Sequence, residues 1–158
     1  METDWLHEAF RGPAWHGPAL LPTLRGVDEA LAAWRPSAGR HSIREIVVHA
    51  AWWKHTVRRR ITGDRDATFP YRGRNWFTLP PGEDSAGFER SWRDDVRLLG
   101  AEHEALAASV AKLPARAATR IVHAGQTAAF NIRGAGAHDI YHAGQIQLIK
   151  ALRQRRQG

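Results

Sequence analysis

The chain has 158 residues, no cysteine and a formal net charge of +7. This is the length of one ordinary domain that can bury most of its apolar surface, so we expect a single domain over residues 1–158. Without cysteine, the chain has no disulfides, no thiolate metal ligands and no cysteine nucleophile, so any thiol chemistry must use a borrowed thiol.

The N-terminal residues do not read as a targeting signal. Glu2, Asp4 and Glu8 interrupt the apolar residues there, so the continuous apolar core of a secretory signal is missing. No apolar run approaches the roughly 20 residues that a membrane span requires. We therefore expect a cytoplasmic protein that is not bound to a membrane.

Residues 3–34 form a first, broken helical region. Their apolar side chains recur mostly at helical spacing, with prolines interrupting the pattern at positions 13, 18 and 22. Helical pieces are therefore expected here instead of one long helix.

The clearest helix follows over residues 42–61. Ser42 and Glu45 have the spacing of a capping box, and apolar residues then recur at steps of three and four. Gly63 is placed to end this helix.

A long loop is expected over residues 64–84, which contain three prolines and two glycines without a sustained helical period. The loop carries Phe69, Tyr71, Trp76 and Phe77, an aromatic area that needs a packing partner. It covers either the end of the hydrophobic core or, as a lid, a pocket; the sequence does not choose between them.

Two further helices complete the pattern. One fits residues 85–113 and ends at Pro114, the other runs over residues 131–155, and a short extended piece is allowed between them. The inner face of the last helix is expected to carry His138, Tyr141, His142, Gln145, Leu148, Ile149 and Leu152. Three long amphipathic helices after a broken first one predict an all-α four-helix bundle.

Three histidines are candidate ligands of a divalent metal ion. His138 and His142 are four residues apart on a helix, so their side chains point the same way and can share one cation. This spacing alone is weak, because it also arises by chance. A buried imidazole without a partner is costly, however, and His49 lies on the flank of its own apolar stripe, where a neighbouring helix could meet it. Three imidazoles match a catalytic metal site with open positions.

Several segments resemble one protein family. Residues 42–53 read SIREIVVHAAWW and residues 137–146 read AHDIYHAGQI, and both resemble helices of the DinB-like metal-binding superfamily of damage-inducible proteins. The segments WHGP at 15–18 and ITG at 61–63 are similar to family sequence as well. The resemblance implies a four-helix bundle with His49, His138 and His142 as ligands. It also implies thiol-dependent chemistry, since relatives include S-transferases and isomerases that use low-molecular-weight thiols, together with proteins assigned as hydrolases.

Other residues are candidates for supporting roles around the site. His103 is a fourth ligand, a hydrogen-bond donor to a ligand or a residue at the edge of the core, and His16 has no predictable direction. Gln145 orients a ligand, contacts substrate or lines the core, and Tyr141 donates into a pocket or packs. Asp139 is a partner of one imidazole or a surface residue.

The remaining histidines and two glycines complete the sequence-based expectations. We expect surface or loop positions for His7, His41, His55 and His123. Gly134 and Gly136 mark a frayed helix start or a close approach of another segment.

Three functions are compatible with these residues. The first is a metal-dependent enzyme, a thiol transferase or hydrolase acting on a small electrophilic molecule in stress or detoxification. The second is a non-catalytic metal-binding stress protein, which a fourth protein ligand such as His103 would favour. The third, ranked lowest, is nucleic-acid binding, suggested by the net charge of +7 and by the clusters of arginines.

The expected cofactor is one divalent ion, zinc or nickel, with a low-molecular-weight thiol as a candidate cosubstrate. Three imidazoles also suit iron and copper, so the sequence does not name the metal. A homodimer is expected, because dimers are common in the family and the seven tryptophans are more than a bundle this small readily hides.

Overall fold

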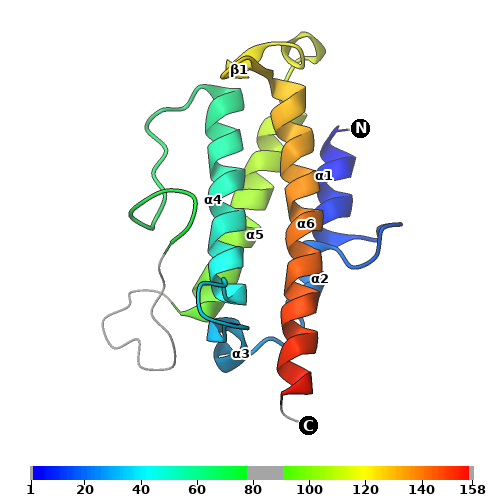
Figure 1. Ribbon diagram of the computed structural model, residues 1–158. Helices are drawn as coiled ribbons and strands as arrows, with labels where there is room; N and C mark the ends of the chain where they lie inside the picture. The colour runs from blue at the N-terminus through cyan, green and yellow to red at the C-terminus, as the bar shows by residue number, and fades with distance from the viewer. Residues whose placement is uncertain (1, 78–90, 157–158) are drawn as a thin grey trace.

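The computed structural model describes residues 2–77 and 91–156. Four helices form a bundle, and they are α1 (Glu2–Arg11), α4 (Ile43–Thr62), α5 (Trp92–Ala111) and α6 (Ala128–Arg155). In this bundle α4 and α5 run in one direction and α1 and α6 in the other, and the last helix runs its full length (Figure 1). Helix α4 packs against α5 and α6, and α1 packs against the same two helices. The predicted all-α four-helix bundle is confirmed.

Short elements make the connections. Helices α2 (Leu20–Thr23) and α3 (Glu29–Ala33) lie between α1 and α4, which matches the expected broken first region. A 3-10 turn (Ala115–Ala117) and an antiparallel hairpin of β1 (Ile121–His123) and β2 (Gln126–Thr127) lie between α5 and α6. The hairpin sits at the end of the bundle where α4 finishes (Figure 1).

The ends of α4 follow from local chemistry. The Ser42 side chain accepts a hydrogen bond from the Glu45 amide, and the Glu45 carboxylate accepts one from the Ser42 amide, so the predicted capping box is present. At the other end Gly63 adopts a φ of 78°, in the left-handed region that glycine enters without strain.

The starts of the next two long helices differ from prediction. Helix α5 begins at Trp92, seven residues later than expected, because Ser91 and Asp94 form a second capping box that fixes the start there. The predicted residues 85–90 of this helix, and 78–84 of the loop, lie outside the described residues. Helix α6 begins at Ala128, three residues early, because the Thr127 side chain caps the Phe130 amide.

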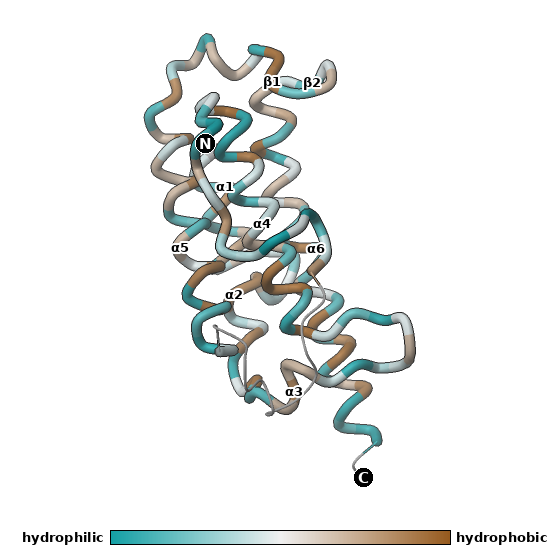
Figure 2. Tube along the Cα trace, turned by 90° about the vertical axis from the view of Figure 1, so that its left-hand side faces the viewer, coloured by the Kyte–Doolittle hydropathy of each residue, from teal (hydrophilic) through white to brown (hydrophobic). Residues whose placement is uncertain are grey.

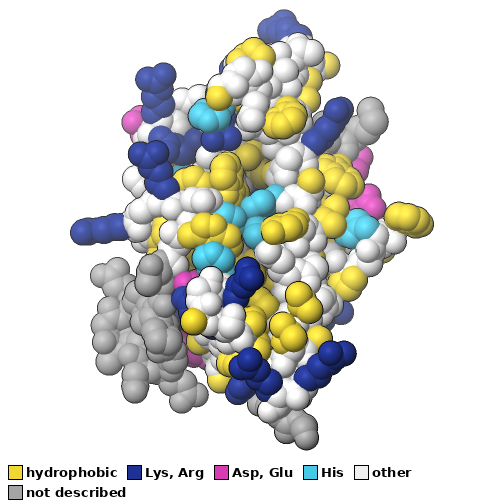
Figure 3. All heavy atoms as spheres, in the orientation of Figure 1, with side chains coloured by type: hydrophobic (Ala, Val, Ile, Leu, Met, Phe, Trp, Pro, Cys, Tyr) yellow, Lys and Arg dark blue, Asp and Glu magenta, His cyan; other side chains and the backbone are white. Residues whose placement is uncertain are grey.

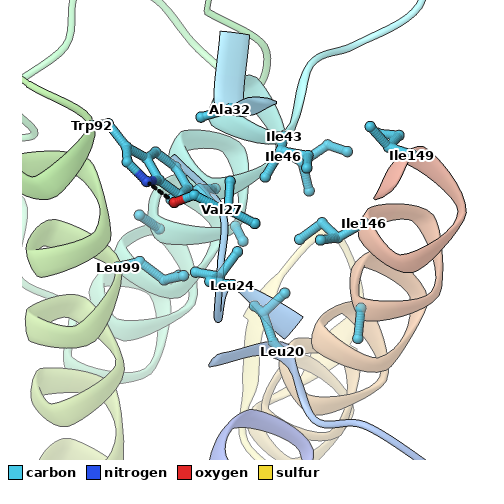
Figure 4. Close-up of a cluster of buried hydrophobic side chains, with 14 of the residues drawn as sticks. Leu20, Leu24, Val27, Ala32, Ile43, Ile46, Trp92, Leu99, Ile146 and Ile149 are labelled. Carbon is cyan, nitrogen blue, oxygen red and sulfur yellow. Dashed lines mark hydrogen bonds between the residues drawn. The ribbon is translucent and has the colours of Figure 1, made fainter. Parts of the chain in front are cut away.

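The core has two main parts. One gathers apolar side chains from α2, α3 and the three long helices, and its residues point toward one another in Figure 4. There the Trp92 indole donates to the Val27 backbone oxygen over 2.9 Å. The second part, nearer the hairpin, includes Leu6, Val57 and Leu106. Hydrophobic and hydrophilic positions alternate along the long helices in Figure 2, as expected of amphipathic helices.

Within residues 2–77 and 91–156, no helix has a stretch long and apolar enough to cross a membrane.

Helix α6 buries a different face from the one predicted. The expected stripe included Tyr141, Leu148 and Leu152, but these side chains are exposed. Because α6 contacts both α1 and α4, its buried face is broad and consists largely of small or polar residues, among them Ala135, Gly136, Asp139, His142 and Ala143. Its apolar residues therefore could not mark this face by themselves.

Candidate metal centre

Three imidazoles from two helices meet at one point. The Nε2 atom of His138 lies 3.0 Å from Nε2 of His49 on α4 and 2.9 Å from Nε2 of His142, one turn further along α6. One ligand atom from each of the three residues lies within 4.8 Å of the others. The structure therefore brings together the three histidines that the sequence singled out, in an arrangement that could hold a metal ion.

The outer nitrogens of two rings have hydrogen-bond acceptors. Nδ1 of His49 lies 2.8 Å from the backbone oxygen of Asn75, and Nδ1 of His142 lies 2.6 Å from Oε1 of Gln145. The amide nitrogen of Gln145 in turn donates to the Tyr141 hydroxyl. An oxygen that only accepts requires hydrogen on the facing Nδ1, which leaves the Nε2 lone pair free to bind a cation.

This arrangement creates a conflict that a cation would resolve. The Nε2 atoms of His49 and His142 both present lone pairs to Nε2 of His138, which can carry a single hydrogen and donate it to one of them. At least one of the two contacts then has no hydrogen between its nitrogens, which is unfavourable. A metal ion held by the three nitrogens would replace this unfavourable contact with coordination, so the donor set fits a divalent ion.

The electrostatics keep these rings neutral. Burial, the largest cause, and the neighbouring imidazoles together lower the pKa of His138 to about 3 and that of His142 to about 4, although the hydrogen bond to Gln145 opposes the shift of His142. Burial also lowers the pKa of His49. Unprotonated imidazole is the form that binds metals, so the three rings are ready as ligands near neutral pH.

The loop after α4 covers one side of the cluster. The Trp76 ring lies between His41 and His49 and stacks on both, with centroids 3.6 Å and 3.8 Å away. Next to it, the Asn75 side chain accepts a hydrogen bond from the Trp53 indole. Phe69 and Phe77 of the same loop pack over Val48 on α4. The described part of the loop therefore packs on apolar surface of α4 and on the His49 ring, whereas its role as a lid over a pocket stays a prediction.

A cavity of about 370 Å³ adjoins the cluster on the side of the hairpin. His138 and Trp53 lie at one end of it, and Arg60, Asn131 and Phe130 line its walls. Figure 3 shows histidine side chains reaching the surface near the middle of this face, over the line where α4 and α6 meet, with hydrophobic side chains around them. The volume is in the range of small-molecule sites.

A buried ion pair lies beside the cluster. Asp139, the residue after His138, is fully buried and forms an ion pair with the buried Lys54 of α4. Burial raises the pKa of Asp139, although Lys54 opposes this effect. The sequence-based alternatives for Asp139 were a partner of an imidazole and a surface residue. Its burial contradicts the surface position, and its carboxylate pairs with Lys54.

His103 and His16 stay apart from the three histidines. His103 is buried, its Nε2 lies 3.0 Å from Nδ1 of His7, and its ring stacks on Phe10 of α1. Burial lowers the pKa of His103 to about 2. Neither residue joins the group of described residues that could hold a metal ion, so of the alternatives for His103 the packing role fits best.

Two expectations for supporting residues need correction. His55 is buried beside Glu102 and Arg58, not at the surface, because α4 is covered by the loop as well as by α5. Of the two alternatives for Tyr141, packing in the core is wrong, because its side chain is 63% exposed; its hydroxyl accepts a hydrogen bond from Gln145. Gln145 itself orients His142, one of the roles open to it.

Sequence reasoning missed two residues of the site, Asn75 and Trp76. Both lie in a segment without periodicity, and their contacts with His49 depend on how the loop returns to α4. The excess of aromatic residues in the loop was the available signal, although it does not specify which ring meets a ligand.

Comparison with known proteins identifies the family. The sequence matches the DinB superfamily over residues 14–146, a range that includes all three histidines. Neither the curated proteins nor the solved structures contain a match to this chain. Because the family match covers most of the 158 residues, the chain belongs to the DinB superfamily.

Proposed function

We propose that this protein is a metal-dependent enzyme in which His49, His138 and His142 hold one divalent ion, zinc or nickel. The observation that carries the proposal is the convergence of three Nε2 atoms, two of them on rings whose Nδ1 atoms face hydrogen-bond acceptors. A divalent ion held there supplies a Lewis acid, which lowers the pKa of a water or thiol so that a nucleophile exists near neutral pH.

The protein's own residues have separate tasks. Asn75 and Gln145 set the orientation of two ligand rings. Trp76 stacks on His49 and keeps water from that face of the ring. The cavity beside His138 has room for a small electrophilic molecule and a low-molecular-weight thiol or water. This division of tasks favours thiol transfer or hydrolysis.

The open coordination supports an enzyme over a non-catalytic metal-binding protein. Structural zinc sites are usually closed by four protein ligands, whereas catalytic sites keep a position for water or substrate. Among the described residues the candidate group has three members, and His103 is engaged with His7 instead.

Metal analysis of the purified protein tests the centre. The parent should carry about one ion per chain, whereas His142→Ala should carry only traces. His123→Ala is the matched control, because His123 is exposed on the hairpin and should leave the metal content unchanged. Equal, substoichiometric metal in all three proteins would reject the metal centre.

Activity is tested separately on metal-loaded protein. A small thiol and an alkyl halide are supplied together, and thiol loss with halide release reports transfer, whereas acid release from an ester without thiol reports hydrolysis. One of these activities should disappear with His142→Ala. Stoichiometric metal without either activity would favour the non-catalytic metal-binding function.

We also propose that the protein forms a homodimer. Trp15 is 99% exposed, and Tyr141 and Leu148 are exposed apolar residues on α6, so described surface is available for a second copy. Size-exclusion chromatography with light scattering tests this: a mass of two chains supports it, and a mass of one chain contradicts it.

A further inference from the structure

The cavity beside His138 contains a cation without an acidic partner. Arg60 is half-buried, and one guanidinium nitrogen donates to Oδ1 of Asn131 over 3.0 Å. No carboxylate among the described residues comes within ion-pair distance of it. Burying a guanidinium without a counter-ion costs free energy, and burial correspondingly lowers the pKa of Arg60.

Arg60 and the candidate metal centre share a neighbour. The guanidinium carbon of Arg60 lies 5.5 Å from the centre of the Trp53 ring, and this ring lies 6.1 Å from the His138 ring. One short molecule lying along Trp53 could therefore touch both. The rest of the wall includes the apolar side chains of Val57, Phe130 and Ala135.

We infer that this cavity binds a small carboxylate with an apolar body, its carboxylate group on Arg60 and its other end beside His138. A carboxylate supplies the counter-ion that the protein leaves out, and arginine binds it in a two-pronged geometry that lysine cannot match. The Asn131 side chain, which also lines the cavity, accepts a hydrogen bond from one guanidinium nitrogen and so restricts its orientation. The inference rests on the proposed function, since it names the substrate class of that same centre.

One of the residues that line the cavity is a glycine, Gly134, which has no side chain to fill the space. A Cβ there would meet nothing within 4 Å. A larger side chain at this position would project into free space, so the glycine keeps the cavity open. This gives a second way to block the site without changing its charge.

A second cavity provides the matched control. It lies on the other side of the cluster and is lined by Arg40, His41 and Gln145, but by none of the three candidate ligands. This second cavity also contains an arginine, so a carboxylate that bound by charge alone would show no preference between the two cavities. Arg40→Met therefore removes the same charge as Arg60→Met at the wrong place.

The test is calorimetric binding of benzoate, with benzyl alcohol as the uncharged probe. Metal-free protein is used first, so that benzoate cannot bind through an ion. The parent should prefer benzoate, and Arg60→Met should lose at least about tenfold in affinity, the size expected for one charge-assisted contact. Arg60→Lys should fall between them, Gly134→Leu should bind neither probe, and Arg40→Met should bind as the parent does.

Unchanged benzoate affinity in Arg60→Met, or a loss confined to Arg40→Met, would overturn the inference. Circular dichroism establishes whether each variant is folded. If Arg60→Met does not fold, benzoate binding to Gly134→Leu provides an independent test of the cavity. Zinc content is measured on the same proteins, and Arg60→Met should keep it. Absence of zinc binding by the parent would reject the metal centre, while the benzoate result on metal-free protein would still decide the role of Arg60.

Discussion

His49 donates from Nδ1 to the backbone oxygen of Asn75 over 2.8 Å, so a loop residue 26 positions further along fixes which nitrogen of the ring faces the cluster. Asn75 has a φ of 65°, a left-handed conformation that asparagine tolerates better than most residues. The position of its carbonyl, and with it the orientation of His49, therefore depends on a conformation that only a few residue types accept.

Substitution of Asn75 should change metal affinity according to backbone preference. Asn75→Gly keeps the left-handed conformation and should retain affinity within a few-fold, although it loses the contact with Trp53. Asn75→Val, which is β-branched, should move the carbonyl and weaken zinc binding by roughly 10–100-fold, the usual cost of losing a ligand's supporting contact. Competition with a chromogenic chelator measures both, and equal affinities would show that the carbonyl does not matter.

Gln145 should act on metal affinity through His142. Gln145→Leu removes the acceptor 2.6 Å from Nδ1 and should weaken zinc binding roughly tenfold or more, whereas Gln145→Glu keeps an acceptor and should preserve binding. Gln147→Leu is the control, because Gln147 is exposed on the same helix. The same chelator competition applies, and a loss in Gln147→Leu as large as in Gln145→Leu would reject this role.

The sequence predicted the framework of the site better than its surroundings. Helical spacing was enough to place His138 and His142 together, because four residues make about one turn whatever the rest of the chain does. His49 joined them through the family resemblance, since its position depends on how two helices pack. Asn75 and Trp76 depend on a loop path, which periodicity does not encode.

Errors in the predicted burial have the same origin. The apolar stripe through Tyr141 and Leu148 predicts the wrong inner face for the last helix, because α1 and α4 pack on small and polar residues instead. Charged residues such as Lys54 and Asp139 are hidden because each compensates the other, and no local pattern reveals this pairing. The capping residue Ser42 is the local signal that predicts the start of α4 correctly. Ser91 and Thr127 are the corresponding signals for the starts of α5 and α6.

Two glycines of α6 should respond oppositely to alanine. A Cβ at Gly136 would overlap the indole of Trp5 on α1, so Gly136→Ala should destabilise the fold by about 1–3 kcal/mol. Gly134 faces open space, so Gly134→Ala should instead stabilise the helix by about 0.5–1 kcal/mol. Urea unfolding measures both free energies, and a stable Gly136→Ala protein would contradict the close packing of α1 on α6.

Acid stability should depend on His103. The buried ring has a pKa of about 2 in the folded protein, lowered by burial and by Lys54, His7 and Arg11, against an ordinary value of 6.5. Between these values the unfolded chain binds the extra proton, so stability falls as the pH decreases below 6.5, by up to about 1.4 kcal/mol per pH unit. The contribution of His103 to stability is fully present above pH 6.5.

His103→Leu should remove this contribution. Metal-free parent and variant are unfolded with urea at several pH values from 7.5 to 5, and the loss of stability over this range should be smaller in the variant, whatever its stability at pH 7.5. Gln147→Leu is the control, because Gln147 is exposed and carries no titratable group. Parallel curves for parent and His103→Leu would show that His103 does not titrate in this way.

The central claim is that one ion sits among His49, His138 and His142, and anomalous diffraction tests it most directly. Crystals of zinc-loaded protein measured above and below the zinc absorption edge should give one anomalous peak, roughly 2.0–2.1 Å from the Nε2 atom of each ring. A peak elsewhere, coordination through Nδ1, or the absence of a peak between the three rings would contradict the account.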